Sequence, residues 1–364
     1  MFFVKHFAVI PPPYGGVSVF VKRLSLALSK HGLLSSAFHS GCIVGIPQKY
    51  NEYYQPFPKH ARSLFVLPYI LRLLYIFKPY QILHTHASFT TCFTVLLIHK
   101  ILKIPVVYTV HSQMIDREFS FLNCIDRFCL RSLASDSKVQ FITVNQNSKK
   151  RLIQKGLNFF NEIKVIPAYI PPVEIGSPSD YLSSSLISFM NSNQLKLLFY
   201  AESFALDAGR DVYGTRLILD LFIRLKQNFP HLKLIFCLAN LRNDIALLEE
   251  LKELITTQNL NSDVYWQIGA IPEMWPLLQS STVLVRPTIT DGDSIMIREA
   301  LAFGLPVITS DVVQRPRGCI TYRSGSFDDL YTKTSLLLNR PFRKVFEQKS
   351  VFDDILNIYH SLLS

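Results

Sequence analysis

The segment 290–300, with the sequence TDGDSIMIREA, combines residue types that could bind a sugar and a phosphate. Asp291 falls in the loop after an apolar run, and a helix is expected to start near Asp293 or Ser294. Glu299 would then project from the second turn of that helix. A loop carboxylate, the free amides of a helix start and a helical carboxylate can together bind a polyol and its attached phosphate. The alternative is an N-capping aspartate followed by an ordinary surface glutamate.

A second candidate anion site follows the first apolar run, where PPPYGGVS contains Gly15 and Gly16. Because glycines lack side chains, backbone N–H groups can approach an anion at the start of a helix expected from about Val17. The dipole of that helix would add a favourable potential. The alternative is a glycine turn that only reverses the chain direction.

Three histidines stand at the ends of expected strands. His84 and His86 follow one strand, and His111 follows the next. His84 and His86 are close enough in sequence to be considered as a metal pair, but no third ligand stands nearby at a recognisable spacing. We therefore expect no metal site, interpret His84 as a structural residue and interpret His111 as a hydrogen-bonding residue of a site.

Short buried strands that alternate with helices would position these residues. Apolar runs rich in β-branched and aromatic residues recur between helix-like segments such as 20–29, 216–227 and 244–256. The alternation predicts an α/β fold, with parallel sheets covered by helices on both faces. The expected strands span residues 2–10, 81–84, 105–110, 139–144, 164–167, 195–200, 232–238, 264–268, 282–286 and 306–309.

The length of 364 residues and one Pro- and Ser-rich break predict two Rossmann-like, doubly wound domains. We expect an N-terminal domain at 1–170, a linker at 171–194, a C-terminal domain at 195–343 and a helix at 344–364 that packs back toward the N-terminal domain. Ligands of such sheets bind at the carboxyl ends of the strands. A cleft between the two domains is therefore the expected site.

Charge is unevenly distributed along the chain, whose formal net charge is +11. Residues 1–170 contain 20 basic and 6 acidic side chains, whereas the remainder contains 18 and 21. The first half should therefore favour a polyanion or an anionic lipid surface. Its basic residues are scattered and no nucleic-acid-binding motif is visible, so nucleic acid is not an expected partner.

Cysteine usage and hydropathy indicate the class of protein. Six cysteines without a C-x-x-C pair indicate reduced thiols rather than a disulfide framework or a structural zinc site. The stretch 1–10 contains a lysine and runs into three prolines, which favours a strand over a signal peptide. Residues 64–77 include Arg72 and are too few to span a bilayer. We expect a soluble, cytoplasmic chain.

Four segments occur in a characteristic order along the chain: PPPYGGVSVFVKRLSLALSKHG, PVVYTVH, Ile166-Pro167 and DGDSIMIREALAFGLPVITSD. Together they resemble glycosyltransferase family 4. The resemblance covers nearly the whole chain and implies a GT-B fold and a retaining transfer from a nucleotide-sugar donor. The family's signature is two glutamates with seven residues between them, and here Asp291 and Glu299 hold those places. RPTITDGDS is similar to a subgroup that builds bacterial O-antigen, capsule or exopolysaccharide.

The resemblance also implies roles for the matching residues. Glu299 would accept hydrogen bonds from the nucleotide ribose, Asp291 would hold hydroxyls of the donor sugar, and His111 would contact that sugar near the reacting carbon. No metal or cofactor is implied, and the main task of the enzyme would be to stabilise the leaving diphosphate. The remaining donor-binding residues would be Gly15, Gly16, Gly292, Asp293 and Ser294.

The chain departs from the family after the first strand of the second domain. Family members carry an arginine and a lysine there in a Gly-Arg … Lys-Gly stretch, whereas this chain reads ESFALDAGRDVYGTR. If Gly214 matches the second glycine, Tyr213 replaces the lysine. Arg210 and Arg216 are then the candidate donor-binding cations, and a plain surface position for Arg210 is the alternative. The departure leaves open a non-catalytic GT-B scaffold, and an epimerase on the same fold is a further alternative.

Polysaccharide enzymes of this family commonly act on polyprenyl-diphosphate-linked acceptors at the inner leaflet. Residues 58–79 combine basic and aliphatic side chains and could lie at a lipid interface, the alternative being a buried helix. The expected partners are thus a nucleotide sugar, a lipid-linked oligosaccharide and an anionic inner-leaflet surface, with the protein cytoplasmic and peripherally bound to the inner membrane. The site as a whole requires Asp291 and Glu299 to share a groove with Gly15, Gly16 and His111.

Overall fold

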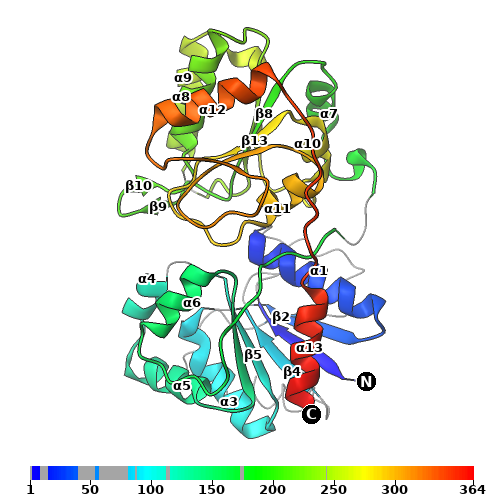
Figure 1. Ribbon diagram of the computed structural model, residues 1–364, viewed down its shortest axis with the longest axis vertical. Coiled ribbons are helices and arrows are strands. Elements are labelled where there is room, and N and C mark those ends of the chain that lie inside the picture. The colour runs from blue at the N-terminus through cyan, green and yellow to red at the C-terminus, as the bar shows by residue number, and fades with distance from the viewer. Residues whose placement is uncertain are drawn as a thin grey trace. The chain divides into compact units, whose positions relative to one another are not determined.

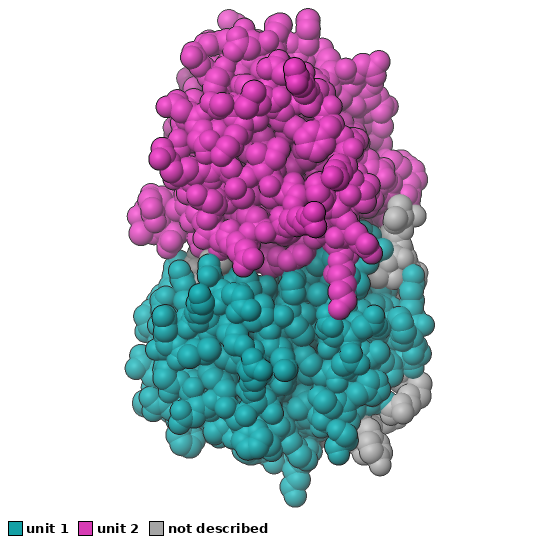
Figure 2. Space-filling model, viewed as in Figure 1, with its two compact units in different colours: residues 1–173, 350–364 teal, residues 174–349 magenta. Residues whose placement is uncertain are grey.

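The structure is a computed structural model that describes residues 2–8, 15–39, 54–56, 81–86, 88–111, 115–172, 176–242 and 244–364. The chain divides into two compact units, which Figure 2 distinguishes by colour: unit 1 contains residues 1–173 and 350–364, and unit 2 contains residues 174–349. Each unit is built on its own parallel sheet. The predicted α/β class with two doubly wound sheets is therefore confirmed.

The sheet of unit 1 has seven described strands in the order β3-β2-β1-β4-β5-β6-β7, all parallel. Strands β4, β5 and β6 are buried along their whole length, as expected for a parallel sheet covered on both faces. The strand order reverses between β1 and β4, where doubly wound sheets bind their ligands. The strands are β1 (Phe3–Phe7), β2 (Leu34–His39), β3 (Tyr54–Pro56), β4 (Gln81–Thr85), β5 (Val106–Val110), β6 (Val139–Thr143) and β7 (Lys164–Val165).

Helices cover both faces of this sheet (Figure 1). On one face Leu83 packs in a core with residues of α3 and α5. The next strand residue, His84, points to the opposite face, where its ring lies against Tyr359 of the last helix. The described helices of unit 1 are α1 (Gly16–Lys30), η2 (Phe89–Thr91), α3 (Cys92–Leu102), α4 (Ile115–Ser120), α5 (Cys124–Ala134), α6 (Gln146–Ile153) and α13 (Phe352–Leu363).

Unit 2 contains a six-stranded parallel sheet in the order β12-β11-β8-β13-β14-β15, and a short hairpin of β9 and β10. Adjacent strand residues again serve opposite faces: Leu197 packs in one core and Leu198 in the other. The strands are β8 (Lys196–Ala201), β9 (Leu206–Asp207), β10 (Arg210–Asp211), β11 (Lys233–Leu238), β12 (Val264–Ile268), β13 (Val283–Arg286), β14 (Val307–Ser310) and β15 (Ile320–Tyr322).

The helices of unit 2 begin inside the stretch that the sequence suggested as a linker. Helix α7 has Ser183 as its N-cap and buries Leu186 and Met190, so residues from 176 onward belong to the unit. Spacing of four between two apolar residues behind a serine cap is the helix signal in this polar stretch. The helices are η3 (Pro178–Asp180), α7 (Ser184–Met190), α8 (Thr215–Lys226), α9 (Ile245–Thr257), η4 (Asn261–Asp263), α10 (Trp275–Ser280), α11 (Ile295–Ala302) and α12 (Phe327–Asn339).

The expected C-terminal helix at 344–364 starts later, at Phe352. Residues 344–349 are extended because their backbone bonds to unit 2: the N–H groups of Lys344 and Phe346 donate to the carbonyls of Gly304 and Leu301 at 3.2 and 3.0 Å. From residue 350 the chain returns to unit 1, where α13 packs.

Two expectations fall on parts of the chain that the structure does not describe. The suggested lipid-interface segment 58–79 lies entirely outside the described residues, and so do residues 11–14 before the glycine pair. Among the described residues, no helix has the length and apolar character needed to cross a membrane.

Candidate functional site

The loop after β13 carries the segment predicted to bind a donor, at the point where the strand order of unit 2 reverses. Two arginines from different parts of the unit hold Asp291 there. Arg286, the last residue of β13, donates from Nε and Nη2 at 2.9 and 3.0 Å. Arg315, beyond β14, donates from Nη1 at 2.7 Å. These three side chains, here named the aspartate–arginine cluster, are nearly buried, with exposed fractions of 3–10%.

The carboxylate of Asp291 has its acceptor positions filled. Oδ2 accepts from both arginines, and Oδ1 accepts from Arg286 and from the N–H of Gly292 at 3.1 Å. Burial would raise the pKa of Asp291, but the two guanidinium groups lower it to about 2. A direct bond from Asp291 to donor sugar hydroxyls, as expected from the sequence, would thus require an arginine to leave. In this geometry the carboxylate serves to fix the arginines.

Helix α11 starts where the sequence suggested. Ser294 is its N-cap and its Oγ accepts from the N–H of Ile297 at 3.5 Å, while Asp293 pairs with Arg298 at 2.8 Å. The capping residue is therefore serine rather than aspartate. Glu299 is only 4% exposed, which corrects the alternative of an ordinary surface glutamate. Its carboxylate is buried on α11, the helix that directly follows the Asp291 loop, so Glu299 is a candidate site residue.

The two arginines expected to replace the family's Arg/Lys pair do not join this cluster. Arg210 is exposed on the β9–β10 hairpin. Arg216 lies on the outer surface of α8, where it pairs with Asp220 at 3.2 Å and with Glu250 at 3.6 Å. Asp211 lies at the N-terminus of α8 and accepts from the backbone N–H groups of Tyr213, Gly214 and Thr215. An anion of the protein itself thus fills the position where a bound anion would lie.

Arg286, rather than Arg210 or Arg216, lies beside Tyr213. Its guanidinium lies over the Tyr213 ring at 5.7 Å from the centroid. The two loops are held together because the N–H of Ile289 donates to the carbonyl of Val212 at 3.0 Å, and because Gly214 leaves room for Pro287. Gly214 has a φ of +73°, and a Cβ there would approach Pro287 within 2.8 Å, so only glycine fits. We did not predict Arg286 and Arg315 as site residues from the sequence. The one sequence feature that they share is that each directly precedes a proline.

In unit 1 the predicted glycine pair lies at the start of α1. Gly15 is the N-cap in an extended conformation, and its N–H donates to Ser18 Oγ at 2.9 Å. Among the residues that the structure describes, added Cβ atoms at Gly15 and Gly16 would meet nothing within 4 Å. The first amides of a helix have no intrahelical acceptor. This helix start therefore has the geometry of an anion site.

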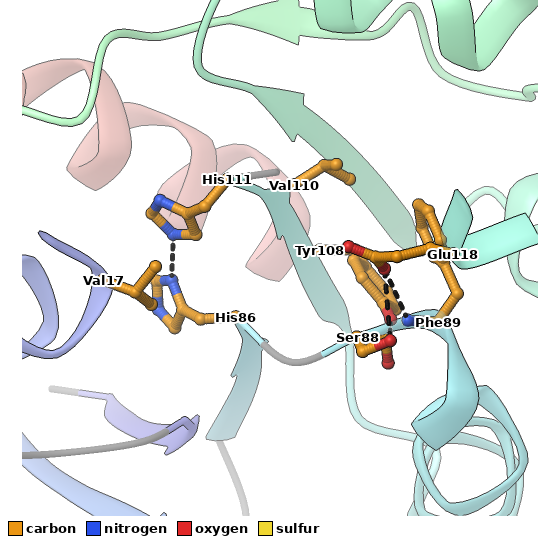
Figure 3. A pocket seen from close by; sticks show the side chains of 8 residues that line it. All are labelled: Val17, His86, Ser88, Phe89, Tyr108, Val110, His111 and Glu118. Carbon is orange, nitrogen blue, oxygen red and sulfur yellow. Dashed lines mark hydrogen bonds between the residues drawn. The ribbon is translucent and has the colours of Figure 1, made fainter. Parts of the chain in front are cut away.

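His111 belongs to a chain of three imidazoles at the carboxyl edge of the same sheet. His111 Nε2 lies 2.9 Å from Nδ1 of His86, and Nε2 of His86 lies 3.4 Å from Nδ1 of His6. His86 and His111 line a pocket of about 270 Å³, across from Ser88 and Glu118 (Figure 3). Glu118 accepts from Ser88 Oγ at 3.2 Å on that far side. The pocket is thus polar on two opposing sides.

The imidazole chain favours one proton arrangement. Burial lowers the pKa of His6 to about 3 and that of His111 to about 4, so both are neutral near pH 7. Each neutral ring donates from one nitrogen only. Nε2 of His6 is buried without a hydrogen-bond partner among the described residues. With no proton on that nitrogen, the Nδ1–H of His6 donates to Nε2 of His86, and the Nδ1–H of His86 donates to Nε2 of His111. The proton of His111 is then on Nδ1, where it can be donated to another group.

The structure brings a third histidine, His6, next to the His84–His86 pair considered from the sequence. His6 pairs in register with His84 across β1 and β4, and nitrogens of His6, His84 and His86 lie within 4.8 Å of one another. Both nitrogens of His84 are already bonded, Nδ1 to the Tyr359 hydroxyl at 2.6 Å and Nε2 to Thr109 Oγ1 at 2.8 Å. A metal ion would have to compete with these bonds. His84 is structural, as expected.

The buried histidines should make stability depend on pH between about 6.5 and 4. In this range the unfolded chain binds protons that folded His6 and His111 do not, so stability falls as the pH drops. At pH 5 each histidine that stays neutral in the folded state should lower the free energy of unfolding by about 2 kcal/mol relative to pH 7. Urea unfolding at both pH values measures this loss, and His6→Leu should reduce it. Equal stability at pH 7 and pH 5 would contradict buried, neutral histidines.

Comparison with known proteins now identifies the family. Residues 14–172 match the description Glycosyltransferase Family 4, and residues 200–324 match Glycosyl transferases group 1. The two matches together span most of the chain and both of its units. The chain belongs to the family 4 glycosyltransferases. The glycosyltransferase MJ1059 of Methanocaldococcus jannaschii, itself uncharacterised, is 25% identical to it over 210 residues. That match covers 56% of this chain and about half, 48%, of the curated relative.

Solved structures show the fold of this glycosyltransferase. Anabaena HepE in complex with UDP and glucose is similar with a TM-score of 0.69 and 16% identity, over 93% of this chain and 90% of HepE. A glycosyltransferase of Rickettsia africae is similar with a TM-score of 0.68 and 14% identity, over 100% and 99%. WaaG, a glycosyltransferase involved in lipopolysaccharide biosynthesis, is similar with a TM-score of 0.62 and 13% identity, over 99% and 93%. The expected GT-B fold is confirmed.

Proposed function

We propose that this glycosyltransferase moves a sugar from a nucleotide-sugar donor to a lipid-linked glycan, with retention of the anomeric configuration. The observation that carries the proposal is the burial of Glu299 on α11, directly beyond the loop that holds Asp291. The similarity to HepE, solved with UDP and glucose, supports a UDP-sugar as the donor to test first. The similarity to WaaG supports a role in bacterial surface-polysaccharide synthesis.

In the proposed site Glu299 accepts hydrogen bonds from the ribose, and the aspartate–arginine cluster stabilises the leaving diphosphate. Two arginines and one aspartate give the cluster a net charge of +1. Arg286, beside Tyr213, then supplies the cation that the family places at the lysine position. Fixed guanidinium groups act strongly on developing phosphate charge because they need no reorganisation during the reaction. This assignment replaces Arg210 and Arg216, and it makes a metal ion unnecessary.

Residues of unit 1 act on the same substrate in this proposal. The amides at Gly15 and Gly16 bind the diphosphate, and the Nδ1–H of neutral His111 donates to a hydroxyl of the transferred sugar. Gly292, Asp293 and Ser294 shape the donor loop through their backbone. The acceptor is a polyprenyl-diphosphate-linked oligosaccharide, which places the enzyme in the cytoplasm, peripherally bound to the inner membrane.

A thermal-shift comparison of UDP-, GDP- and ADP-linked sugars tests the donor assignment. A selective ligand should raise the Tm in proportion to RT ln(1 + [L]/Kd), and the shift should persist in EDTA. Glu299→Gln should lose most of this shift. Asp220→Asn on the exposed face of α8 is the matched control and should keep it. No shift with any nucleotide sugar would reject a donor site in this protein.

A non-catalytic scaffold of a polysaccharide-synthesis complex is the second candidate. It is favoured by the position of Asp211 at the N-terminus of α8 and by the outward pairing of Arg216. A scaffold would release no nucleotide during incubation with donor and acceptor lipid. Release of nucleotide that depends on Glu299 would exclude this candidate.

A further inference from the structure

Unit 1 exposes a stripe of large apolar side chains along α5. Phe121, Ile125 and Phe128 are 64%, 56% and 69% exposed. Ile125 and Phe128, three residues apart, share one side of α5, and Phe121 lies in the turn just before the helix. The opposite side of α5 buries Cys129, Leu130 and Leu133 against the sheet. The helix is therefore apolar both toward the core and toward the outside.

Such a stripe is unusual for a surface that only contacts water. A helix that covers a sheet normally presents polar residues outward, and single exposed apolar residues need no explanation. Three large ones in a row expose enough apolar area to indicate a binding surface. Their burial in an apolar medium would be favourable by the hydrophobic effect.

The exposed charges of α5 itself have one sign. Arg127 and Arg131 are exposed on α5, and Arg117 of α4 lies over the ring of Phe121 at 5.9 Å. The acidic residue of α5, Asp126, is buried and faces inward, and Asp116 of α4 pairs with Lys155. A surface that combines large apolar side chains with an excess of basic ones complements an anionic interface with an apolar interior. An acidic bilayer has that chemistry.

We propose that Phe121, Ile125, Phe128, Arg127 and Arg131, here named the α5 patch, bind the surface of an anionic lipid bilayer. The phenylalanine and isoleucine side chains enter the boundary between headgroups and acyl chains, and the arginines contact lipid phosphates. Each arginine near such a surface strengthens binding about fivefold. The inference rests on the proposed function only in that a lipid-linked acceptor requires a membrane-bound enzyme. It assigns that contact to α5, outside the segment 58–79 considered from the sequence.

Flotation of the full-length protein with vesicles tests the α5 patch. We expect binding to vesicles of phosphatidylcholine with 30–40% phosphatidylglycerol, on the order of the anionic content that attracts basic segments, and much weaker binding to pure phosphatidylcholine. Ile125→Ser/Phe128→Ser should weaken binding roughly tenfold or more. Arg127→Gln/Arg131→Gln should weaken it about thirtyfold on acidic vesicles and remove most of its salt dependence.

Leu336→Ser, which replaces an equally exposed apolar residue of α12 in unit 2, is the matched control and should leave binding unchanged. Unchanged vesicle binding by both α5 variants would overturn the proposal. A concentration-dependent dimer that Ile125→Ser/Phe128→Ser abolishes, without vesicle binding, would assign the patch to a second copy of the chain instead. The thermal shift with nucleotide sugars should persist in every variant, so failure of the lipid surface is distinguishable from failure of the donor site.

Discussion

Glu299→Gln is expected to reduce sugar transfer by about a hundredfold or more while the circular dichroism spectrum stays native. The side chain is buried on α11 and keeps its size in this variant, so that the loss of charge is the main change. Hydrogen bonds to a charged group contribute about 1.5–3 kcal/mol each, and two bonds to a ribose therefore amount to at least a hundredfold. Release of nucleotide from the donor in the presence of acceptor lipid measures the effect.

Glu250→Gln is the matched control, since Glu250 lies on the same unit but is exposed and pairs with Arg216 on the surface. It should transfer sugar at the unmodified rate. His111→Ala should abolish transfer. Full turnover by both His111→Ala and Glu299→Gln would show that the site lies elsewhere in the protein.

Asp291→Asn is expected to destabilise unit 2 by about 3–5 kcal/mol, because it leaves Arg286 and Arg315 buried without a counter-charge. At about 2–4 °C per kcal/mol, the Tm of that unit should fall by roughly 10 °C. The pKa of Asp291 is about 2 in the folded state against 3.8 ordinarily, so its contribution is complete above pH 4 and is lost only as the pH falls toward 2. Scanning calorimetry at pH 7 measures the effect.

Asp220→Asn removes an exposed carboxylate–arginine pair from the same unit and should change stability by less than about 1 kcal/mol. The double variant Asp291→Asn/Arg315→Met removes one of the two stranded charges and should recover part of the lost Tm. If Asp291→Asn were as stable as Asp220→Asn, the aspartate–arginine cluster would not exist as described.

Local signals in the sequence were sufficient to predict the fold class and the start of the helix that follows the Asp291 loop. Alternating buried strands and amphipathic helices indicate parallel sheets, and the structure has two. The predicted start of a helix near Asp293 or Ser294 agrees with a serine cap at the start of α11. These predictions succeed because strand burial and helix capping involve residues only a few positions apart.

Contacts between distant residues could not be predicted in the same way. Arg315 reaches Asp291 from 24 positions away, and His6 reaches His86 from 80. No periodicity connects such pairs, and only the strand order brings them together. The family pattern indicated Arg210 and Arg216 because it compares residues by their positions along the chain. In the structure the arginine that bonds Asp291 comes from a separate strand, β13, and is Arg286.

The return of residues 350–364 to unit 1 decides how the protein can be dissected. A fragment that stops at residue 173 would contain every strand of the first sheet but would lack the Tyr359 hydroxyl that bonds Nδ1 of His84. It would also uncover Phe2, whose ring packs edge-on against Tyr359 at 6.0 Å. Separate production of unit 1 therefore requires the last fifteen residues to be supplied, for instance as a tethered extension after residue 173.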